Sequence, residues 1–232
     1  MKAFLAIPVL VILLVIAVYN SITRQEWKEK GTLEWVAKKA KKEGKQKVVI
    51  RAPLALYVSV NSLEEALDNF DVIVVEVVGS KSSKSSPHNI QTWYRLRVLE
   101  TIHSRPVREC PSCPSPGSPP QDMLPVKADE ILVPKYGGGL KVDDVDVVSV
   151  DPDFPELSPS QKYLLFISLD HSHRVGALTM GPQSVFTVEN DGSIKPLDGR
   201  HHPLKDNIWQ QGGGHVDKLK ARIKDGAPRL GG

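Results

Sequence analysis

The sequence predicts a mainly β protein, a small antiparallel barrel or sandwich with one early and one C-terminal helix, preceded by an N-terminal transmembrane helix. The chain opens with one long apolar run, and from residue 47 onward about eight short segments rich in branched residues alternate with turn signals. Within this body, helical periodicity occurs once early and once at the end.

Composition narrows the range of functions. With 232 residues, 41% hydrophobic and 25% charged, the chain has an ordinary globular make-up. Its net charge of +3 is unevenly distributed, because residues 24–51 hold ten Lys and Arg against four Glu, which leaves residues 52–232 mildly acidic. A nucleic-acid-binding surface needs clustered cations, so we expect no nucleic-acid partner for the body.

The N-terminal apolar run predicts export or membrane insertion. Residues 3–19 are uncharged; this is the short end of the roughly 17 to 25 residues that span a bilayer and longer than the roughly 7 to 15 of a signal-peptide core. We favour an uncleaved single-pass anchor, with a cleaved signal sequence and a buried core helix as alternatives. Counting cations on its two sides leaves the orientation open, but a long domain after a short N-terminus is usually exported, so an extracytoplasmic body is favoured over a cytoplasmic one.

The basic neck that follows predicts a short helix over residues 32–44, with Leu33, Val36 and Ala40 on one face and Gly44 just after its end. Tryptophans among lysines suit the surface of an anionic bilayer, so the lipid bilayer is an expected partner. The candidate membrane-surface residues are Trp27, Trp35, Lys38, Lys39, Lys41 and Lys42. The alternative is a solvated helical spacer between membrane and body.

The body is predicted element by element from its periodicity. A helix over residues 62–70, capped by Asn61 or Ser62, separates a first strand from a buried Val/Ile strand. A serine-rich loop, residues 80–89, then leads to a strand with one exposed face. The predicted strands are 47–60, 71–80, 90–100, 130–135, 140–150, 161–170, 174–180, 183–190 and 194–197, and the last helix is 215–226. The resulting division is an anchor or signal sequence (1–22), a helical neck (23–46), a β domain (47–200) with an inserted proline-rich loop (103–128), and a linker with an amphipathic helix (201–232).

Three segments carry a resemblance to a known family: "FDVIVVEVVGS", "TWYRLRVLETI" and "LSPSQKYLLFIS". Their order, over residues 58–190, resembles the netrin-module and tissue-inhibitor-of-metalloproteinase type of OB-like barrel, with Tyr163, Leu164, Leu165 and Phe166 on the late strand. The resemblance implies an OB-like fold. Those inhibitors use a mature N-terminal cysteine and a disulfide framework, and both are missing here, so the inhibitory activity is not implied.

Histidines and acidic residues offer candidate metal sites. The pairs His171/His173 and His201/His202 would suit zinc if their loops met, and Asp170 with His171 would suit acid–base chemistry; the alternative is a polar loop beside a turn. A second group could bind Ca²⁺ or form a solvated strand face. This group is Asp143, Asp144, Asp146, Asp151 and Asp153.

Two further groups complete the candidates. Trp93, Arg95 and Arg97 would face outward from one strand, to contact an anionic or carbohydrate ligand or to form cross-strand ion pairs. Cys110 and Cys113 are flanked by prolines that forbid the helix a thioredoxin-type pair needs, so we expect a loop disulfide in an exported domain and free thiols otherwise.

No Gly-x-Ser-x-Gly, phosphate-loop, His-Glu-x-x-His or dinucleotide motif occurs. We therefore expect a non-enzymatic, membrane-anchored protein without a cofactor, whose β domain binds a protein or envelope component. The alternatives are a metal-dependent hydrolase of the envelope using the histidine loops, and a cytoplasm-facing membrane scaffold.

Overall fold

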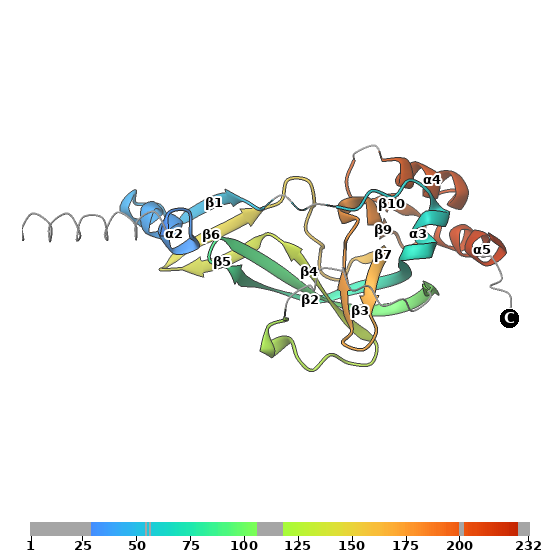
Figure 1. Cartoon of the computed structure of the whole chain (residues 1–232), viewed down its shortest axis with the longest axis horizontal. Coiled ribbons are helices and arrows are strands. Elements are labelled where there is room, and N and C mark those ends of the chain that lie inside the picture. Colours follow the sequence, from blue (N-terminus) through green and yellow to red (C-terminus); the bar gives the residue numbers. More distant parts are fainter. Residues whose placement is uncertain (1–28, 54, 56, 106–117, 200–201, 227–232) are drawn as a thin grey trace, which may run out of the picture.

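The computed structural model describes residues 29–53, 55, 57–105, 118–199 and 202–226, in which ten strands lie between helices at the two ends (Figure 1). The helices are α2 (Leu33–Lys42), α3 (Leu63–Asn69), α4 (Pro203–Gly212) and α5 (Val216–Gly226), with 3-10 turns η1 (Gln121–Met123) and η2 (Gly181–Ser184). The strands are β1 (Lys47–Arg51), β2 (Asp71–Ser86), β3 (Asn89–His103), β4 (Glu130–Tyr136), β5 (Gly138–Val142), β6 (Val145–Val150), β7 (Lys162–Asp170), β8 (Val175–Ala177), β9 (Val185–Val188) and β10 (Ile194–Pro196). Among these residues no helix is long and apolar enough to cross a membrane, and the predicted transmembrane segment lies outside them.

Five strands close into a barrel. They follow the order β7-β2-β3-β4-β8, and β8 pairs back onto β7 through Ser168↔Ala177 and its neighbours. The β4–β8 pair is parallel, so the barrel is mixed and the prediction of a purely antiparallel one is wrong. The predicted small barrel is confirmed in this form.

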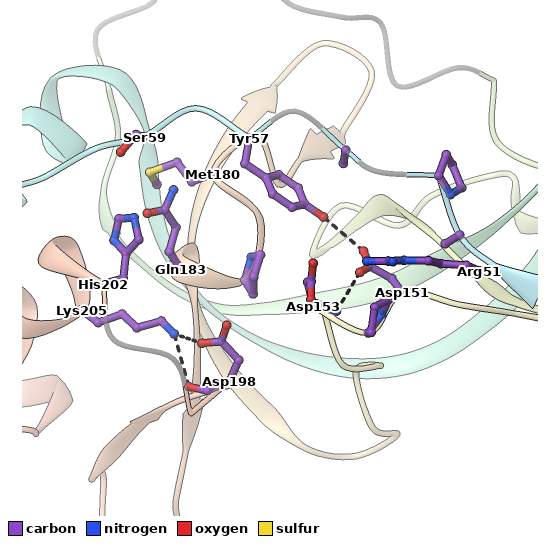
Figure 2. A pocket seen from close by; sticks show the side chains of 15 residues that line it. Arg51, Tyr57, Ser59, Asp151, Asp153, Met180, Gln183, Asp198, His202 and Lys205 are labelled. Atoms are coloured by element: carbon purple, nitrogen blue, oxygen red, sulfur yellow. Dashed lines mark hydrogen bonds and ion pairs between the residues drawn. The ribbon is translucent and has the colours of Figure 1, made fainter.

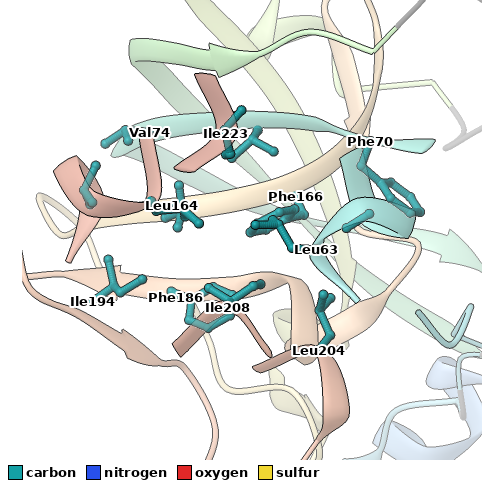
Figure 3. Packing of buried hydrophobic residues seen from close by; sticks show 14 of the residues in the cluster. Leu63, Phe70, Val74, Leu164, Phe166, Phe186, Ile194, Leu204, Ile208 and Ile223 are labelled. Atoms are coloured by element: carbon teal, nitrogen blue, oxygen red, sulfur yellow. The ribbon is translucent and has the colours of Figure 1, made fainter. Parts of the chain in front are cut away.

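Strands β9 and β10 extend the sheet beyond β7, and helices α3, α4 and α5 cover this extension (Figure 1). Figure 3 shows Leu164 and Phe166 of β7 beside Leu204 and Ile208 of α4, with Ile223 of α5 in the same cluster. The predicted faces of α3 and α5 are buried here, and Ser62 caps α3 by accepting a hydrogen bond from the amide of Glu65.

Strands β2 and β3 form a hairpin longer than predicted. The serine-rich segment expected to be a loop is strand as far as Ser86, which pairs with Asn89 across the turn. Its polar side chains bond to one another: Ser82 and Thr92 lie 2.9 Å apart, and the Thr92 hydroxyl donates to the Gly137 carbonyl at 2.8 Å. Because the side chains paired here are polar, the segment shows no alternation of apolar and polar residues, and periodicity alone could not predict that it is a strand.

The tip of this hairpin meets a second, three-stranded sheet of order β1-β6-β5. Helix α2 lies on one face of this sheet, and Leu33, Ala37 and Ala40 form a core with Ile90 of the hairpin and Val147 of β6. The neck helix is therefore packed onto the folded body, and the picture of a separate solvated spacer is wrong over α2. Its predicted end is confirmed, since Gly44 has a φ of 71° directly after the C-cap.

Two predicted strands are broken by local chemistry. The strand expected over 47–60 ends at Arg51. The described residues that follow, 52–53, 55 and 57–60, form no strand, and we call them the strap. The strand expected over 140–150 is the hairpin β5–β6, because Asp143 and Asp144 turn the chain with φ of 47° and 68°. Aspartate tolerates this left-handed conformation, and the two together make the tight turn that a right-twisted hairpin favours.

The predicted C-terminal linker contains a helix that the sequence did not reveal. Helix α4 begins at Pro203, and its N-cap is His202, whose Nδ1 accepts a hydrogen bond from the Leu204 amide at 3.2 Å. It ends at Gly212, and its C-cap, Gly213, has a φ of 52°. The glycines expected to form a flexible linker therefore make a turn between α4 and α5.

Candidate functional site

A cleft of about 320 Å³ lies where the small sheet meets the extended barrel sheet (Figure 2). Strands β1 and β6 are parallel, so both end at the same edge, and the Ala52 amide still bonds to the Val150 carbonyl at 2.8 Å. The residues just beyond these ends, together with the strap, η2 and the start of α4, line the cleft. Segments distant in the sequence therefore build one site.

Tyr57 and Asp151 fix one wall. The Tyr57 hydroxyl donates to Asp151 Oδ2 at 3.3 Å, while Asp151 Oδ1 accepts the amides of Asp153 at 2.9 Å and Phe154 at 3.2 Å. Burial and the charge of Asp151 raise the pKa of Tyr57 above its usual value. The phenol stays protonated, so Tyr57 acts as a hydrogen-bond donor.

The opposite wall holds a buried ion pair. Lys205 of α4 is 3% exposed, forms an ion pair with the Asp198 carboxylate, and donates to the Asp198 carbonyl at 3.2 Å (Figure 2). Burial lowers the pKa of Lys205, and it lowers the pKa of the neighbouring His202, whose imidazole is therefore neutral at neutral pH. These groups hold the start of α4 against the end of β10.

Gln183 is the least satisfied group in the cleft. Its Nε2 donates to the Val58 carbonyl at 2.7 Å and so holds the strap, but its Oε1 is buried and has no hydrogen-bond partner among the described residues. The residue is only 6% exposed. A buried acceptor left unpaired destabilises a protein by about 1–3 kcal/mol, so a ligand N–H or O–H that reached Oε1, on local movement of the groups that cover it, would remove that penalty.

Most polar groups of the cleft already have partners within the protein. Asp151 is hydrogen-bonded to the protonated phenol of Tyr57, Lys205 is paired with Asp198, and Nδ1 of His202 is engaged as a helix cap. Apolar atoms of Met180 and Pro182 lie beside the orphan acceptor of Gln183. An apolar pocket with a few convergent polar atoms is the usual form of a small-molecule site.

The structure separates the predicted histidine loops. His171 and His173 lie in the β7–β8 turn, where His171 Nε2 is 3.3 Å from buried Asp71 and His173 Nδ1 is 2.8 Å from Asp170. Asp170 therefore pairs with His173, and the predicted Asp170–His171 pair is wrong. His202 lines the cleft, His171 lines a different cavity at the end of the barrel, and His201 lies outside the described residues. Within the described ranges, no three His, Cys, Asp or Glu side chains lie close enough together to hold a metal ion.

The acidic residues are likewise divided. Asp143 and Asp144 form the β5–β6 turn and Asp146 is exposed on β6, whereas Asp151 and Asp153 line the cleft. They therefore do not share one face.

Of the predicted ligand-contact residues, Trp93 is 1% exposed and packs against Met123 and Leu132, so the prediction that it faces outward is wrong. The two arginines form cross-strand ion pairs, which was the alternative interpretation. Arg95 lies 2.9 Å from Glu130 and Arg97 lies 3.0 Å from Glu76.

The predicted membrane-surface residues of α2 line a shallow hollow on its outer side. They are Trp35, Lys38, Lys39 and Lys42. Lys39 lies 5.5 Å from the centre of the Trp35 ring, and Lys41 lies 3.5 Å from Asp144. Trp27, Cys110 and Cys113 lie outside the described residues.

Neither a protein-family model nor a curated protein matches the sequence. The residues of the cleft must therefore be judged on their geometry. Sequence reasoning missed Tyr57, Gln183, Asp198 and Lys205, because no motif surrounds them and only the tertiary fold brings them together.

Proposed function

We propose that this protein is a non-enzymatic, membrane-anchored binding protein whose extracytoplasmic β domain holds a hydrogen-bond-donating ligand in the cleft beside Gln183. The observation that carries the proposal is the buried, unpartnered Oε1 of Gln183. It lies in a cleft that is also lined by apolar residues such as Met180 and Pro182.

The N-terminal sequence supports the proposed location. The apolar residues 3–19 have the length of a short membrane span, and the cations that follow favour an anionic surface. Trp35 and its neighbouring lysines lie on the side of α2 that is not packed on the small sheet. We propose that this side lies against lipid head groups.

The five-stranded barrel supports a relation in fold to the netrin-module and tissue-inhibitor group. We extend this relation to the architecture alone. The two cysteines of the sequence, Cys110 and Cys113, do not supply the disulfide framework of that group, so the proposed activity is binding of a different ligand.

A matched pair of probes tests the proposal. Benzamide carries an amide donor, and methyl benzoate has nearly the same shape without one. The full chain in detergent is titrated with each probe and followed by nuclear magnetic resonance. We expect benzamide to shift the side-chain amide signals of Gln183 until the shift saturates. Methyl benzoate should bind at least about five-fold more weakly, since a donor to a buried acceptor is worth about 1–3 kcal/mol.

Two variants control the measurement. Gln183→Met removes the acceptor at nearly constant volume, together with the Nε2 bond to Val58, and should abolish the preference for benzamide. Gln91→Met makes the same substitution on β3, outside the cleft, and should leave the preference intact. Equal binding of the two probes, or benzamide shifts confined to residues outside the cleft, would refute the proposal.

A further inference from the structure

Strand β1 lies at the border of the small sheet, and one of its two edges is unpaired. Within the described part of the chain β1 pairs only with β6, and Figure 1 shows it along the outer border of that sheet. Of the other borders, β10 is three residues long and ends in Pro196, which has no amide hydrogen to donate. The edge of β1 is therefore a surface that a further strand could extend.

The register identifies the backbone groups that this edge presents. The Asp146 amide donates to the Gln46 carbonyl, and the Ala52 amide donates to the Val150 carbonyl, each at the ends of the parallel pair. In such a ladder, alternate residues direct both backbone groups to the partner strand. Val48 and Ile50 thus face β6, so the amides and carbonyls of Lys47, Val49 and Arg51 point away from it.

The side chains of the same three residues lie on the sheet face opposite α2. Val48 and Ile50 pack toward α2, so Lys47, Val49 and Arg51 share the other face. Val49 is 62% exposed there, and Val150, paired with Arg51, is 44% exposed. A cation therefore stands on each side of an exposed valine along one strand edge.

This charge pattern selects the partner. A second copy adding its own β1 antiparallel about Val49 would bring Lys47 opposite Arg51, and like charges directly opposite each other destabilise a pair. A strand with an apolar residue between two acidic ones would place a carboxylate opposite each cation and pack its apolar side chain on Val49. The edge is thus complementary to an acidic, extended peptide.

We propose that the free edge of β1 is a docking site for an extended protein segment of the pattern acidic-x-apolar-x-acidic, which adds to the small sheet as a fourth strand. The backbone groups of Lys47, Val49 and Arg51 supply the hydrogen bonds, and their side chains supply the selectivity. This surface shares Arg51 with the lining of the cleft but does not include Gln183, and its test uses different probes, so it stands or fails independently of the ligand proposed for the cleft.

A palindromic probe tests the proposal without assuming a strand direction. The probe is fluorescein-labelled Ser-Glu-Thr-Val-Thr-Glu-Ser with an amidated end, and the control probe has Lys in place of both Glu. We expect fluorescence anisotropy with the full chain, at low salt, to show the Glu probe binding about ten-fold more tightly than the Lys probe, because two attractive pairs replace two repulsive ones.

Two substitutions at one position separate strand addition from charge attraction. Val49→Pro removes an amide that points to the edge, where proline is tolerated, and should weaken binding of the Glu probe at least ten-fold. Val49→Thr keeps the amide and should change binding less than three-fold. Lys47→Glu leaves the backbone unchanged and should abolish the preference between the probes, because each probe then makes one attractive and one repulsive pair with the introduced carboxylate and Arg51; this keeps the proposal testable if Val49→Pro unfolds the small sheet.

Three results would overturn the proposal. The first is equal binding of the Glu and Lys probes, and the second is undiminished binding by a folded Val49→Pro variant. The third is concentration-dependent dimerisation that Val49→Pro abolishes, without binding of either probe. The last result would assign the edge to a second copy of the chain.

Discussion

Substitution of Leu33 tests whether α2 is an integral part of the folded body. Leu33 is fully buried between α2 and the small sheet, in a core that includes Ile90 and Val147. Leu33→Ala removes three buried carbon groups, each worth about 0.8 kcal/mol of stability. The cavity left between α2, the small sheet and the hairpin adds to this loss. We expect the free energy of unfolding to fall by about 2.5–5 kcal/mol.

Thermal unfolding of the full chain in detergent, followed by tryptophan fluorescence, measures this effect. For a chain of this length each kcal/mol lowers the melting temperature by about 2–4 °C, so the expected decrease for Leu33→Ala is at least about 5 °C. Lys38→Ala, on the exposed side of the same helix, is the matched control and should change the melting temperature by no more than about 1 °C. A melting temperature of Leu33→Ala equal to that of the control would show that α2 is not packed on the sheet.

Three further substitutions test other parts of the fold. Burial opposes ionisation of Glu130, but its hydrogen bond with Arg95 holds its pKa below the usual 4.5. The ionised carboxylate therefore stabilises the fold above pH 4.5, and this contribution is lost as the pH falls through the lowered pKa. We expect the difference in urea midpoint between wild type and Glu130→Gln to shrink below pH 4.5. Gly138→Ala would place a Cβ 2.1 Å from Thr92 Oγ1 at a φ of 119°, and we expect circular dichroism melts to show a loss of at least about 3 kcal/mol, whereas an unchanged melt would contradict the position of β5 against the hairpin. Ser62→Ala removes the cap of α3 and should lower stability by about 1 kcal/mol in urea titrations, and Ser62→Gly by only a few tenths; equal losses would argue against the capping bond.

The elements predicted correctly are those in which apolar residues recur at the period of a strand or a helix and face a large hydrophobic cluster. The Val/Ile strand before Val77, the strand through Tyr163 to Phe166 and the helix that contains Ile223 bury their apolar residues in the two largest hydrophobic clusters. Their patterns are local, so the sequence alone predicts them. The Asn-Asp-Gly-Ser turn before β10 is local in the same way, with Gly192 at a φ of 82°.

The elements predicted wrongly depend on contacts between distant segments. The polar end of the β2–β3 hairpin is held by Ser82, Thr92 and the Gly137 carbonyl, which only the folded chain brings together. Trp93 is buried because the short η1 turn places Met123 over a strand face that alternation predicts to be exposed. The sequence did not predict the candidate site for the same reason, because Gln183 bonds to the Val58 carbonyl of the strap, which is distant from it in the sequence.

The parallel pairing of β1 with β6 determines how the domain would respond to mechanical force. Residues 1–46 precede β1, while β6 leaves the small sheet at Val150 toward the rest of the body. A pull on the N-terminal segment therefore loads the two strands from opposite ends, in shear. All five residue pairs from Lys47↔Asp146 to Arg51↔Val150 resist together, whereas an antiparallel pair in this position would open one bond at a time. If the domain is held at its N-terminus and pulled by a bound partner, the β1–β6 pair is therefore loaded in shear, the direction in which all its hydrogen bonds resist together.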